Sequence, residues 1–329
     1  MKRDGASPTM KDVARQAGVS LGTVSKVING LPVGDEYRQR VEAAAKKLGY
    51  QVNSYARGLK TNKTYSAALI IPTLQNPFFA HLADEIAACL SRQQYRTMLM
   101  ITYFDPAAEQ KSISLVKMNK IDGIIALTYN PELDVDENLP FVSIDRHVSA
   151  SIPCVSSDNY AGGQLAAQKL IELGSERLLF MRIGSDVYSE VDKRGAGFEN
   201  YCRMKGVACE SIILRDDDTL EPFFRYIDGH IRDGQPDFDG VFCNTDLLAC
   251  RILTHLRGRG VRVPEDVQII GYDGILDFGT DRLYCSTIIQ PVRQMAEAAV
   301  NVLLNQDLKS MPAHLSLPVR YIPGGTTKD

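Results

Sequence analysis

The 329-residue sequence has no apolar run long enough to cross a membrane and no pair of cysteines in a CxxC spacing. Its longest apolar runs, such as 67–71, fall far short of the roughly 20 residues that a transmembrane helix needs. The N-terminal segment MKRDGASPTMKD has no apolar stretch that would serve as a signal peptide. The seven cysteines are odd in number and scattered, which favours buried thiols over disulfides. We therefore expect a cytoplasmic protein without a membrane partner.

The motifs of common enzyme chemistries are also missing. The chain has no GxxxxGK phosphate loop, no HExxH zinc motif and no GxSxG nucleophile elbow. The closest approach to a dinucleotide fingerprint, at Gly195 and Gly197, lacks the third glycine. We therefore expect no catalytic residues, no cofactor and no metal. The histidines are dispersed along the chain without the spacing of metal ligands, at His81, His147, His230, His255 and His314.

Charge is distributed unevenly between the two ends of the chain. Residues 1–64 carry 12 Lys or Arg and 5 Asp or Glu, a net charge of +7. Residues 65–329 carry 25 basic and 35 acidic residues, a net charge of −10. A compact basic head on an acidic body suggests a module that binds a polyanion, joined to a part with another task. Charge alone leaves open a basic surface that is merely solvated.

Three short helical patterns fill the first 50 residues. We expect helices over 10–16, 21–28 and 35–48, with Thr9 and Ser20 as N-caps of the first two. Their apolar stripes favour a tight helix-turn-helix with a third, supporting helix. A small helical bundle that binds another protein is the alternative interpretation.

From about residue 65, short apolar runs alternate with helical stretches. Such alternation with continuous apolar strands predicts parallel sheets covered on both faces. About 260 residues of this pattern predict two lobes, with a ligand in the crevice between them at the carboxyl ends of the strands. The polar, basic segment 51–64 is expected to be a linker. The expected strands are 67–71, 97–102, 123–127, 141–144, 177–183, 209–214, 240–243 and 267–270.

A helix-turn-helix places the N-terminal part of its second helix in the major groove of DNA. Here that part offers Leu21 for an apolar contact and the hydroxyls of Thr23 and Ser25 for phosphates. Lys26 reaches a guanine edge or a phosphate, while Gly22 has no side chain to read with. Direct readout from this helix is therefore sparse and depends largely on Lys26.

The stretch TMKDVARQAGVSLGTVSKVING closely resembles the head motif of the lactose-repressor (LacI/GalR) family, and EAAAKKLGYQVNSYARGLKT resembles its third helix and hinge. The resemblance continues in the family's order through IIPTLQNPFF, FVSIDR, SSDNYAGG, NTDLLA, VPEDVQIIGYDG and STIIQP. It implies an all-α helix-turn-helix head, joined by a hinge to an α/β, two-lobed core like the type I periplasmic binding proteins.

The resemblance also implies where these parts begin and end. The DNA-binding head would cover 1–52, the hinge 53–64, and the effector-binding and dimerisation core 65–329. Within the core, the N-lobe would comprise about 65–158 plus 291–318, and the C-lobe about 159–290 plus 319–329.

For DNA, the resemblance implies a homodimer on a palindromic operator in which each head reads one half-site. The hinge would fold into a helix on DNA and insert Leu59 into the minor groove, which bends the site. Val52 stands where the family often has proline, and Lys26 where arginine is common. The residues expected at DNA are Thr9, Leu21, Gly22, Thr23, Ser25, Lys26, Asn29, Tyr37, Asn53, Ala56, Arg57 and Leu59.

For the core, the resemblance implies a polyhydroxylated effector that carboxylates and an arginine hold while aromatic rings stack on it. Arg194 and Asp273 are the first choices. A surface ion pair of Arg194 with Asp192 or Glu190 is the structural alternative. Asp246 precedes a helical pattern and is expected to be structural. The expected effector contacts are Phe78, Phe79, Asp145, Tyr188, Glu190, Arg194, Thr245, Asp273 and Gln290.

These features together predict a bacterial, nucleoid-associated transcriptional regulator that represses sugar-utilisation genes and responds to a small saccharide. A nucleobase effector and a phosphorylated carrier protein as corepressor are alternatives within the same class. A sugar-processing enzyme fused to the head is the alternative of another class. The chain ends in PVRYIPGGTTKD, without an apolar heptad tail, which favours a dimer over a tetramer. Both directions of the response, inducer and corepressor, are compatible with the sequence.

Overall fold

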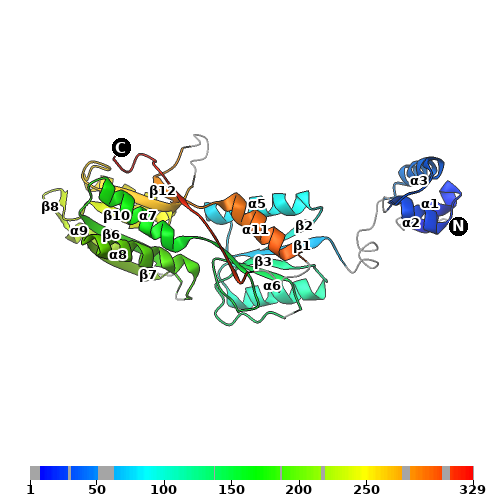
Figure 1. Ribbon diagram of the computed structural model, residues 1–329, viewed down its shortest axis with the longest axis horizontal. Coiled ribbons are helices and arrows are strands. Elements are labelled where there is room, and N and C mark those ends of the chain that lie inside the picture. Colours follow the sequence, from blue (N-terminus) through cyan, green and yellow to red (C-terminus); the bar gives the residue numbers. More distant parts are fainter. Residues whose placement is uncertain are drawn as a thin grey trace. The chain divides into compact units, whose positions relative to one another are not determined.

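The chain divides into two compact units with the boundary between Tyr65 and Ser66 (Figure 1). No helix among the described residues is long and apolar enough to span a membrane. The computed structural model describes residues 8–28, 31–50, 63–136, 138–185, 187–215, 219–275, 282–305 and 312–328.

The N-terminal unit contains α1 (Met10–Ala17), α2 (Leu21–Ile28) and α3 (Asp35–Leu48). Both predicted N-caps are confirmed. The Thr9 hydroxyl accepts the Asp12 N–H, and the Asp12 carboxylate accepts the Thr9 N–H at 3.0 Å, which completes a capping box. The Ser20 hydroxyl accepts the Thr23 N–H at 3.0 Å. The apolar stripes meet in one core of Val13, Ala14, Ala17, Val24, Val27, Val41 and Ala44.

The turn between α1 and α2 is fixed from α3. Gly18 ends α1 in the left-handed conformation, with φ of 62°. The Arg40 guanidinium of α3 donates to the Ala17 carbonyl oxygen from Nε at 3.1 Å and from Nη2 at 2.8 Å. These bonds satisfy a carbonyl that the helix end leaves free, so α3 holds the turn in position.

The larger unit contains two six-stranded sheets, and we call the parts built on them the N-lobe and the C-lobe. The N-lobe sheet has the order β13-β5-β4-β3-β1-β2, with every pair parallel. Figure 1 shows α5 and α11 on one face of this sheet and α6 on the other. The elements are β1 (Ser66–Ile71), α5 (Pro77–Arg92), β2 (Arg96–Ile101), α6 (Pro106–Met118), β3 (Ile124–Leu127), β4 (Phe141–Ile144), β5 (Cys154–Ser157), α11 (Val292–Leu304) and β13 (His314–Leu317).

The C-lobe sheet has the order β14-β12-β11-β10-β6-β7, and only β14 runs antiparallel to its neighbour. Between α9 and β10, the strands β8 (Ile231–Arg232) and β9 (Gln235–Pro236) form a separate, short antiparallel hairpin. The other elements are α7 (Asn159–Glu172), β6 (Arg177–Gly184), the 3₁₀ turn η1 (Glu190–Asp192), α8 (Lys193–Lys205), β7 (Ala208–Arg215), α9 (Glu221–Gly229), β10 (Gly240–Cys243), α10 (Asp246–Gly258), β11 (Gln268–Asp273), β12 (Ser286–Ile289) and β14 (Arg320–Ile322).

Continuous apolar strands reflect burial on both faces of the sheet. In β6, Leu178 and Phe180 pack into a cluster with α7 and α8, whereas Leu179 and Met181 pack into a second cluster with α9 and α10. The chain crosses between the lobes after β5, after β12 and after β13, because each of these strands is followed by an element of the other lobe. The expected helical head and two-lobed α/β core are confirmed.

The expected strands are present, with ends that differ by at most three residues. The largest difference is in β11, which continues past the expected end at 270 to Asp273. The elements not predicted from the sequence are the 13-residue helix α11 and the shorter elements β5, α9, β8, β9, β12, β13 and β14. β5 illustrates the reason: CVSS has two serines, both fully buried, so its sequence lacks the apolar run that marked the other strands.

Candidate functional site

Seven of the residues predicted to face DNA lie within the described residues, and five of these belong to α2. Val24 and Val27 face the core, so Leu21 and Lys26 of the same helix are left exposed. Thr23 and Ser25 are half-buried, and Gly22 and Tyr37 are exposed. The Thr9 hydroxyl donates to the Asp12 carboxylate at 2.6 Å, within the capping box of α1. Asn29, Asn53, Ala56, Arg57 and Leu59 lie outside the described residues.

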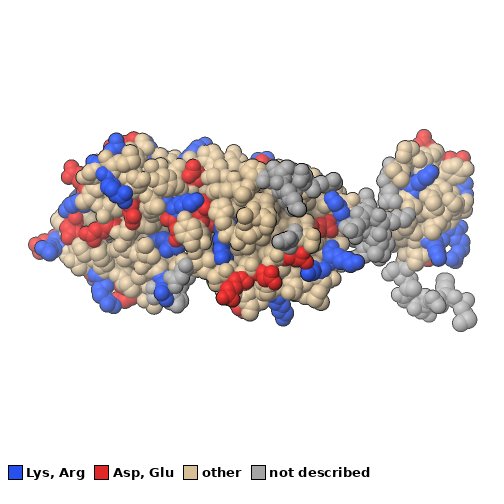
Figure 2. Space-filling model, turned by 60° about the horizontal axis from the view of Figure 1, so that its bottom comes forward, with Lys and Arg blue, Asp and Glu red and all other residues tan. Residues whose placement is uncertain are grey.

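Basic side chains gather on the visible face of the helical unit (Figure 2). Lys26 on α2 and Arg15 on α1 are both exposed, and Arg15 pairs with Asp12 at 3.2 Å. Phosphate contacts need exposed cations beside the recognition helix. The geometry of this unit therefore suits contact with a nucleic acid backbone.

A cavity of about 150 Å³ lies between the N-lobe and the C-lobe. Six of the predicted effector contacts line it, three from each lobe: Phe78, Phe79, Asp145, Arg194, Thr245 and Asp273. The remaining lining residues were not predicted from the sequence: Thr73, Asn76, Phe104, Tyr129, Arg182, Ile183, Gly184, Ser185, Val187, Ser189, Val191 and Asn244.

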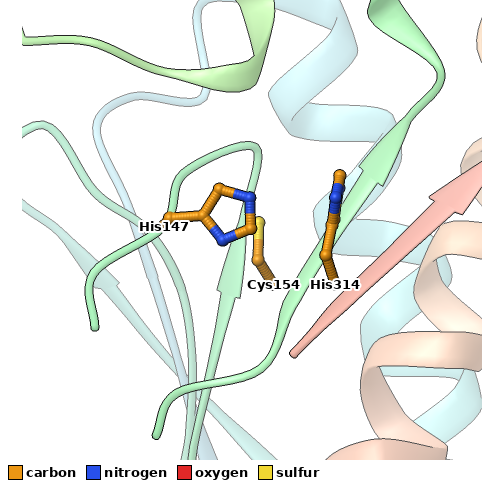
Figure 3. A group of neighbouring side chains, drawn as sticks. All are labelled: His147, Cys154 and His314. Atoms are coloured by element: carbon orange, nitrogen blue, oxygen red, sulfur yellow. The ribbon is translucent and has the colours of Figure 1, made fainter. Parts of the chain in front are cut away.

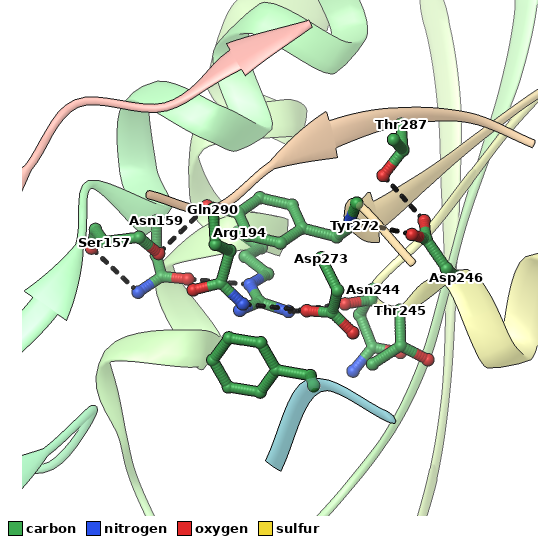
Figure 4. Close-up of polar contacts among 12 residues, drawn as sticks. Ser157, Asn159, Arg194, Asn244, Thr245, Asp246, Tyr272, Asp273, Thr287 and Gln290 are labelled. Atoms are coloured by element: carbon green, nitrogen blue, oxygen red, sulfur yellow. Dashed lines mark hydrogen bonds and ion pairs between the residues drawn. The ribbon is translucent and has the colours of Figure 1, made fainter. Parts of the chain in front are cut away.

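Arg194 is the best-anchored side chain of this cavity (Figure 4). Its Nε donates to Oδ1 of Asn159 at 2.7 Å, and its Nη1 donates to the carbonyl oxygen of Asn244 at 2.6 Å. The guanidinium stacks 3.6 Å from the centre of the Tyr272 ring, and Nη1 lies 3.7 Å from Oδ1 of Asp273. Arg194 is only 2% exposed, so it is a preorganised, buried cation.

The alternative of a surface ion pair for Arg194 is wrong. Asp192 pairs instead with Arg182 of β6, at 2.5 Å. Glu190 pairs with Lys193, whose Nζ lies 2.7 Å from Oε1. Both acidic residues next to Arg194 in the sequence therefore have other cations as partners.

The position of Arg194 depends on the close approach of α7 and α8. A Cβ atom at Gly163 of α7 would lie 1.9 Å from the Arg194 carbonyl oxygen. A Cβ atom at Gly197 of α8 would lie 2.1 Å from the Tyr160 carbonyl oxygen. Only glycine lets the two backbones come this near, and the approach brings Arg194 within reach of Asn159.

Two buried carboxylates face the cavity from the ends of strands. Asp145 follows β4 with φ of 55°, and Asp273 ends β11 with φ of 121°. Burial raises the pKa of Asp145 to about 6, against the opposing charge of Arg194. Burial also raises the pKa of Asp273, again opposed by Arg194. Oδ1 of Asp145 is buried without a hydrogen-bond partner among the described residues.

Gln290 holds the Asp273 carboxylate in position through a hydrogen bond. Its Nε2 donates to Oδ1 of Asp273 at 2.8 Å, while its Oε1 is buried without a partner in the described part of the chain. Gln290 is not part of the cavity lining. The amide therefore positions Asp273 in this structure rather than contacting the cavity itself.

Aromatic rings form the N-lobe wall of the cavity. Asn76 accepts the Phe78 N–H at 2.9 Å and so begins α5, which places Phe78 and Phe79 in an edge-to-face pair 5.9 Å apart. Phe104 and Tyr129 form a second pair 5.3 Å apart. Phe104 follows β2 and Tyr129 follows β3. Their places after the carboxyl ends of parallel strands are the signal that would have found them.

The structure does not bring Tyr188 or Glu190 to this cavity. Tyr188 is 66% exposed, and the Glu190 carboxylate is directed to Lys193 and His147. Thr245 lines the cavity, but its hydroxyl accepts the Leu248 N–H as the N-cap of α10.

Asp246 is structural, as expected. Its Oδ2 accepts the N–H groups of Gly274 and Ile275 at 2.8 and 2.7 Å, and its Oδ1 accepts the Thr287 hydroxyl at 2.6 Å. These bonds hold the backbone that directly follows Asp273 (Figure 4). The Asp246 carboxylate thus helps to fix the position of the Asp273 carboxylate.

Two family models match this chain. The model described as bacterial regulatory proteins of the lacI family matches residues 9–53. The model described as periplasmic binding proteins and sugar binding domain of the LacI family matches residues 64–311.

Similar proteins cover almost the whole chain. The sucrose operon repressor of Pediococcus pentosaceus is 33% identical over 97% of this chain and 99% of its own length. The ribose operon repressor of Bacillus subtilis (strain 168) is 34% identical over 97% of this chain and 98% of its own length. The crystal structure of the Lac repressor dimer bound to operator and the anti-inducer ONPF has the same fold. It matches with a TM-score of 0.81 and 21% identity, over 98% of this chain and 99% of that one. On these matches and this architecture, the chain belongs to the LacI family of bacterial regulatory proteins.

Proposed function

We propose that this regulator represses genes for the use of a sugar and that a monosaccharide bound between its lobes changes its affinity for operator DNA. In this proposal the protein binds a palindromic operator as a homodimer and acts in the cytoplasm, at the nucleoid. In this function the protein catalyses no reaction.

The observation that carries the effector proposal is the unpartnered Oδ1 of Asp145 beside Arg194 and Asp273 in the cavity wall. A buried acceptor without a partner costs stability, and a ligand hydroxyl would satisfy it. Together the two carboxylates and the guanidinium offer acceptors and donors to several hydroxyl groups at once. Phe78 and Phe79 offer ring surface to the apolar C–H face of a sugar.

The size of the cavity favours a small sugar. Its volume of about 150 Å³ is below the roughly 300–1,000 Å³ typical of pockets for drug-sized ligands. A single sugar ring suits this space better than a disaccharide. A nucleobase is the second candidate, because the paired rings of Phe104 and Tyr129 would stack on a planar base.

Exposed apolar residues on the edge strand β2 and on the helix α6 of the N-lobe support a dimer. β2 is an edge strand, and its Met98 and Leu99 are 40% and 42% exposed. Leu115 and Met118 of α6 are exposed as well. Burying such residues against a second copy would remove apolar surface from water and cover the strand edge.

Control of DNA binding follows from linkage. An effector that prefers one arrangement of the lobes shifts the operator affinity only if the two arrangements hold DNA differently. Operator and effector must then change each other's affinity by the same factor. A phosphorylated carrier protein that binds the core surface is the alternative effector within the same scheme.

The experiment is to select a DNA site for the full-length protein from a random pool and to measure its affinity by fluorescence anisotropy. We expect a palindromic site whose affinity changes at least fivefold with one monosaccharide. The Asp145→Asn variant is expected to bind this site without a sugar response. Asp105→Asn, an exposed helix cap that asparagine replaces well, is the matched control. Failure to select any DNA site would overturn the proposal, and a response only to a nucleobase or a phosphorylated carrier protein would overturn its sugar component.

A further inference from the structure

Two histidines and a cysteine that are far apart in the sequence meet in the N-lobe (Figure 3). His147, Cys154 and His314 each offer a ligand atom, and these atoms lie within 4.8 Å of one another. The dispersed histidines of the sequence were expected to form no metal site. That expectation rested on the spacing of the histidines along the chain, and this spacing does not show which residues adjacent strands bring together.

The strand pairing explains why these residues meet. His314 is the register partner of Cys154 on the adjacent parallel strand, so both side chains project from the same face of the sheet. His147 follows β4, the other neighbour of β5, and its ring packs edge-on against the His314 ring with centres 4.7 Å apart. The His314 Nε2 also lies 2.8 Å from the Ser156 hydroxyl, and a metal bound at this nitrogen would replace that hydrogen bond.

A fourth ligand is available from the C-lobe. The Glu190 carboxylate is 3% exposed, and its oxygens lie 3.1 Å from Nε2 of His147 and 3.8 Å from Nε2 of His314. Lys193 is the present partner of both carboxylate oxygens, at 2.7 and 2.8 Å. Because the Lys193 side chain is 37% exposed, its ammonium can turn to water when a cation replaces it.

We propose that His147, Cys154 and His314, with Glu190 as the fourth ligand, bind a divalent transition metal, with Zn²⁺ as the best match. Two imidazole nitrogens, one thiolate and one carboxylate oxygen form a tetrahedral set that suits this borderline-soft ion. Zinc holds its ligands at about 2.0–2.1 Å for nitrogen and 2.3 Å for sulfur, which places them roughly 3.4–3.6 Å apart. Small rotations of the side chains would close the remaining gap, and the half-exposed His147 ring has room for such a movement on its solvent side.

The site would act as a bridge between the lobes. Three ligands belong to the N-lobe, and Glu190 belongs to the turn before α8 of the C-lobe. The Glu190 N–H already donates to the Asp145 carbonyl oxygen at 2.8 Å, so the same turn contacts a residue of the effector cavity. A metal that joins these ligands would favour the arrangement of the lobes seen here, in which Glu190 lies beside both histidines. By linkage, it would raise the affinity for any ligand that prefers this arrangement.

The experiment is a titration of the full-length, reduced and chelator-treated protein with Co²⁺, a spectroscopic substitute for Zn²⁺. We expect one equivalent to give visible ligand-field bands and a sulfur-to-cobalt charge-transfer band in the near ultraviolet, and Zn²⁺ to displace both. Cys154→Ser should abolish the charge-transfer band. Cys89→Ser, which removes a buried thiol in α5 of the same lobe, should leave it unchanged.

Two further variants keep the test decisive if Cys154→Ser does not fold. His147→Ala changes a half-exposed side chain and should lower the Co²⁺ affinity at least about tenfold. Glu190→Gln keeps the shape but weakens the fourth ligand, and we expect a similar loss. The absence of a stoichiometric cobalt complex, or a charge-transfer band that survives in Cys154→Ser, would overturn the proposal. None of these readouts depends on a sugar or an operator.

Discussion

Replacement of Asp145 by asparagine should make the effector-free protein more stable at neutral pH and unable to bind its effector. The side chain is 5% exposed, and its Oδ1 has no partner among the described residues. Asparagine has the same shape and no charge, and it is among the residues that best tolerate the φ of 55° at this position. The substitution therefore changes the charge of the site while preserving its backbone.

The magnitude follows from the pKa of Asp145. Burial raises this pKa from the usual 3.8 to about 6, so the folded protein holds the proton more tightly than the unfolded chain does. The resulting contribution to stability is complete below pH 4 and is lost as the pH rises through 6. Ionised Asp145 thus costs about 3 kcal/mol at pH 7, and Asp145→Asn should recover up to that amount.

The assay is urea unfolding of the effector-free protein, followed by circular dichroism between pH 4 and pH 7.5. We expect Asp145→Asn to exceed the wild type in stability at pH 7 and to converge with it near pH 4. Asp105→Asn should follow the wild-type curve throughout. A variant that is no more stable at pH 7, or a gap that persists at pH 4, would refute the reasoning from burial.

Three further substitutions test the other parts of the account. Gly197→Ala should destabilise the C-lobe by roughly 1–3 kcal/mol in urea unfolding, because the new methyl group separates α7 from α8. The same change should weaken effector binding. An unchanged free energy of unfolding together with an unchanged effector affinity would contradict the packing argument. Lys26→Ala should weaken operator binding by about 1–3 kcal/mol and relax the preference at one base pair, and an unchanged binding profile would reject the placement of α2 on DNA. Thr9→Ala should cost about 1 kcal/mol at the α1 cap and speed amide exchange in α1, whereas unaltered protection would show that the capping box is dispensable.

The sequence predicted the elements whose signal is local. The N-caps at Thr9 and Ser20 and the strands with continuous apolar runs are all present. In the cavity, Asp145 was found because it directly follows a predicted strand, and Asp273 because it lies three residues past the expected end of another. Arg194 was found through the resemblance to the family. Such positions depend on a few neighbouring residues, so they can be read along the chain.

What the sequence missed depends on contacts between distant segments. Phe104 and Tyr129 come together because β2 and β3 flank β1 in the sheet, an order that the sequence does not state. Glu190 precedes Arg194 closely but is directed away from the cavity, since Lys193 and His147 attract its carboxylate. The pairing of β13 with β5 likewise brings His314 beside Cys154 across about 160 residues of sequence.

The central claim is that a sugar binds between the lobes through Asp145 and Asp273, and isothermal titration calorimetry with a panel of pentoses and hexoses tests it most directly. The account predicts that one monosaccharide binds the wild type and Asp105→Asn with one site per chain, and that Asp145→Asn and Asp273→Asn each lose this binding. A panel without any binding, or a sugar whose affinity is unchanged in both cavity variants, would contradict it.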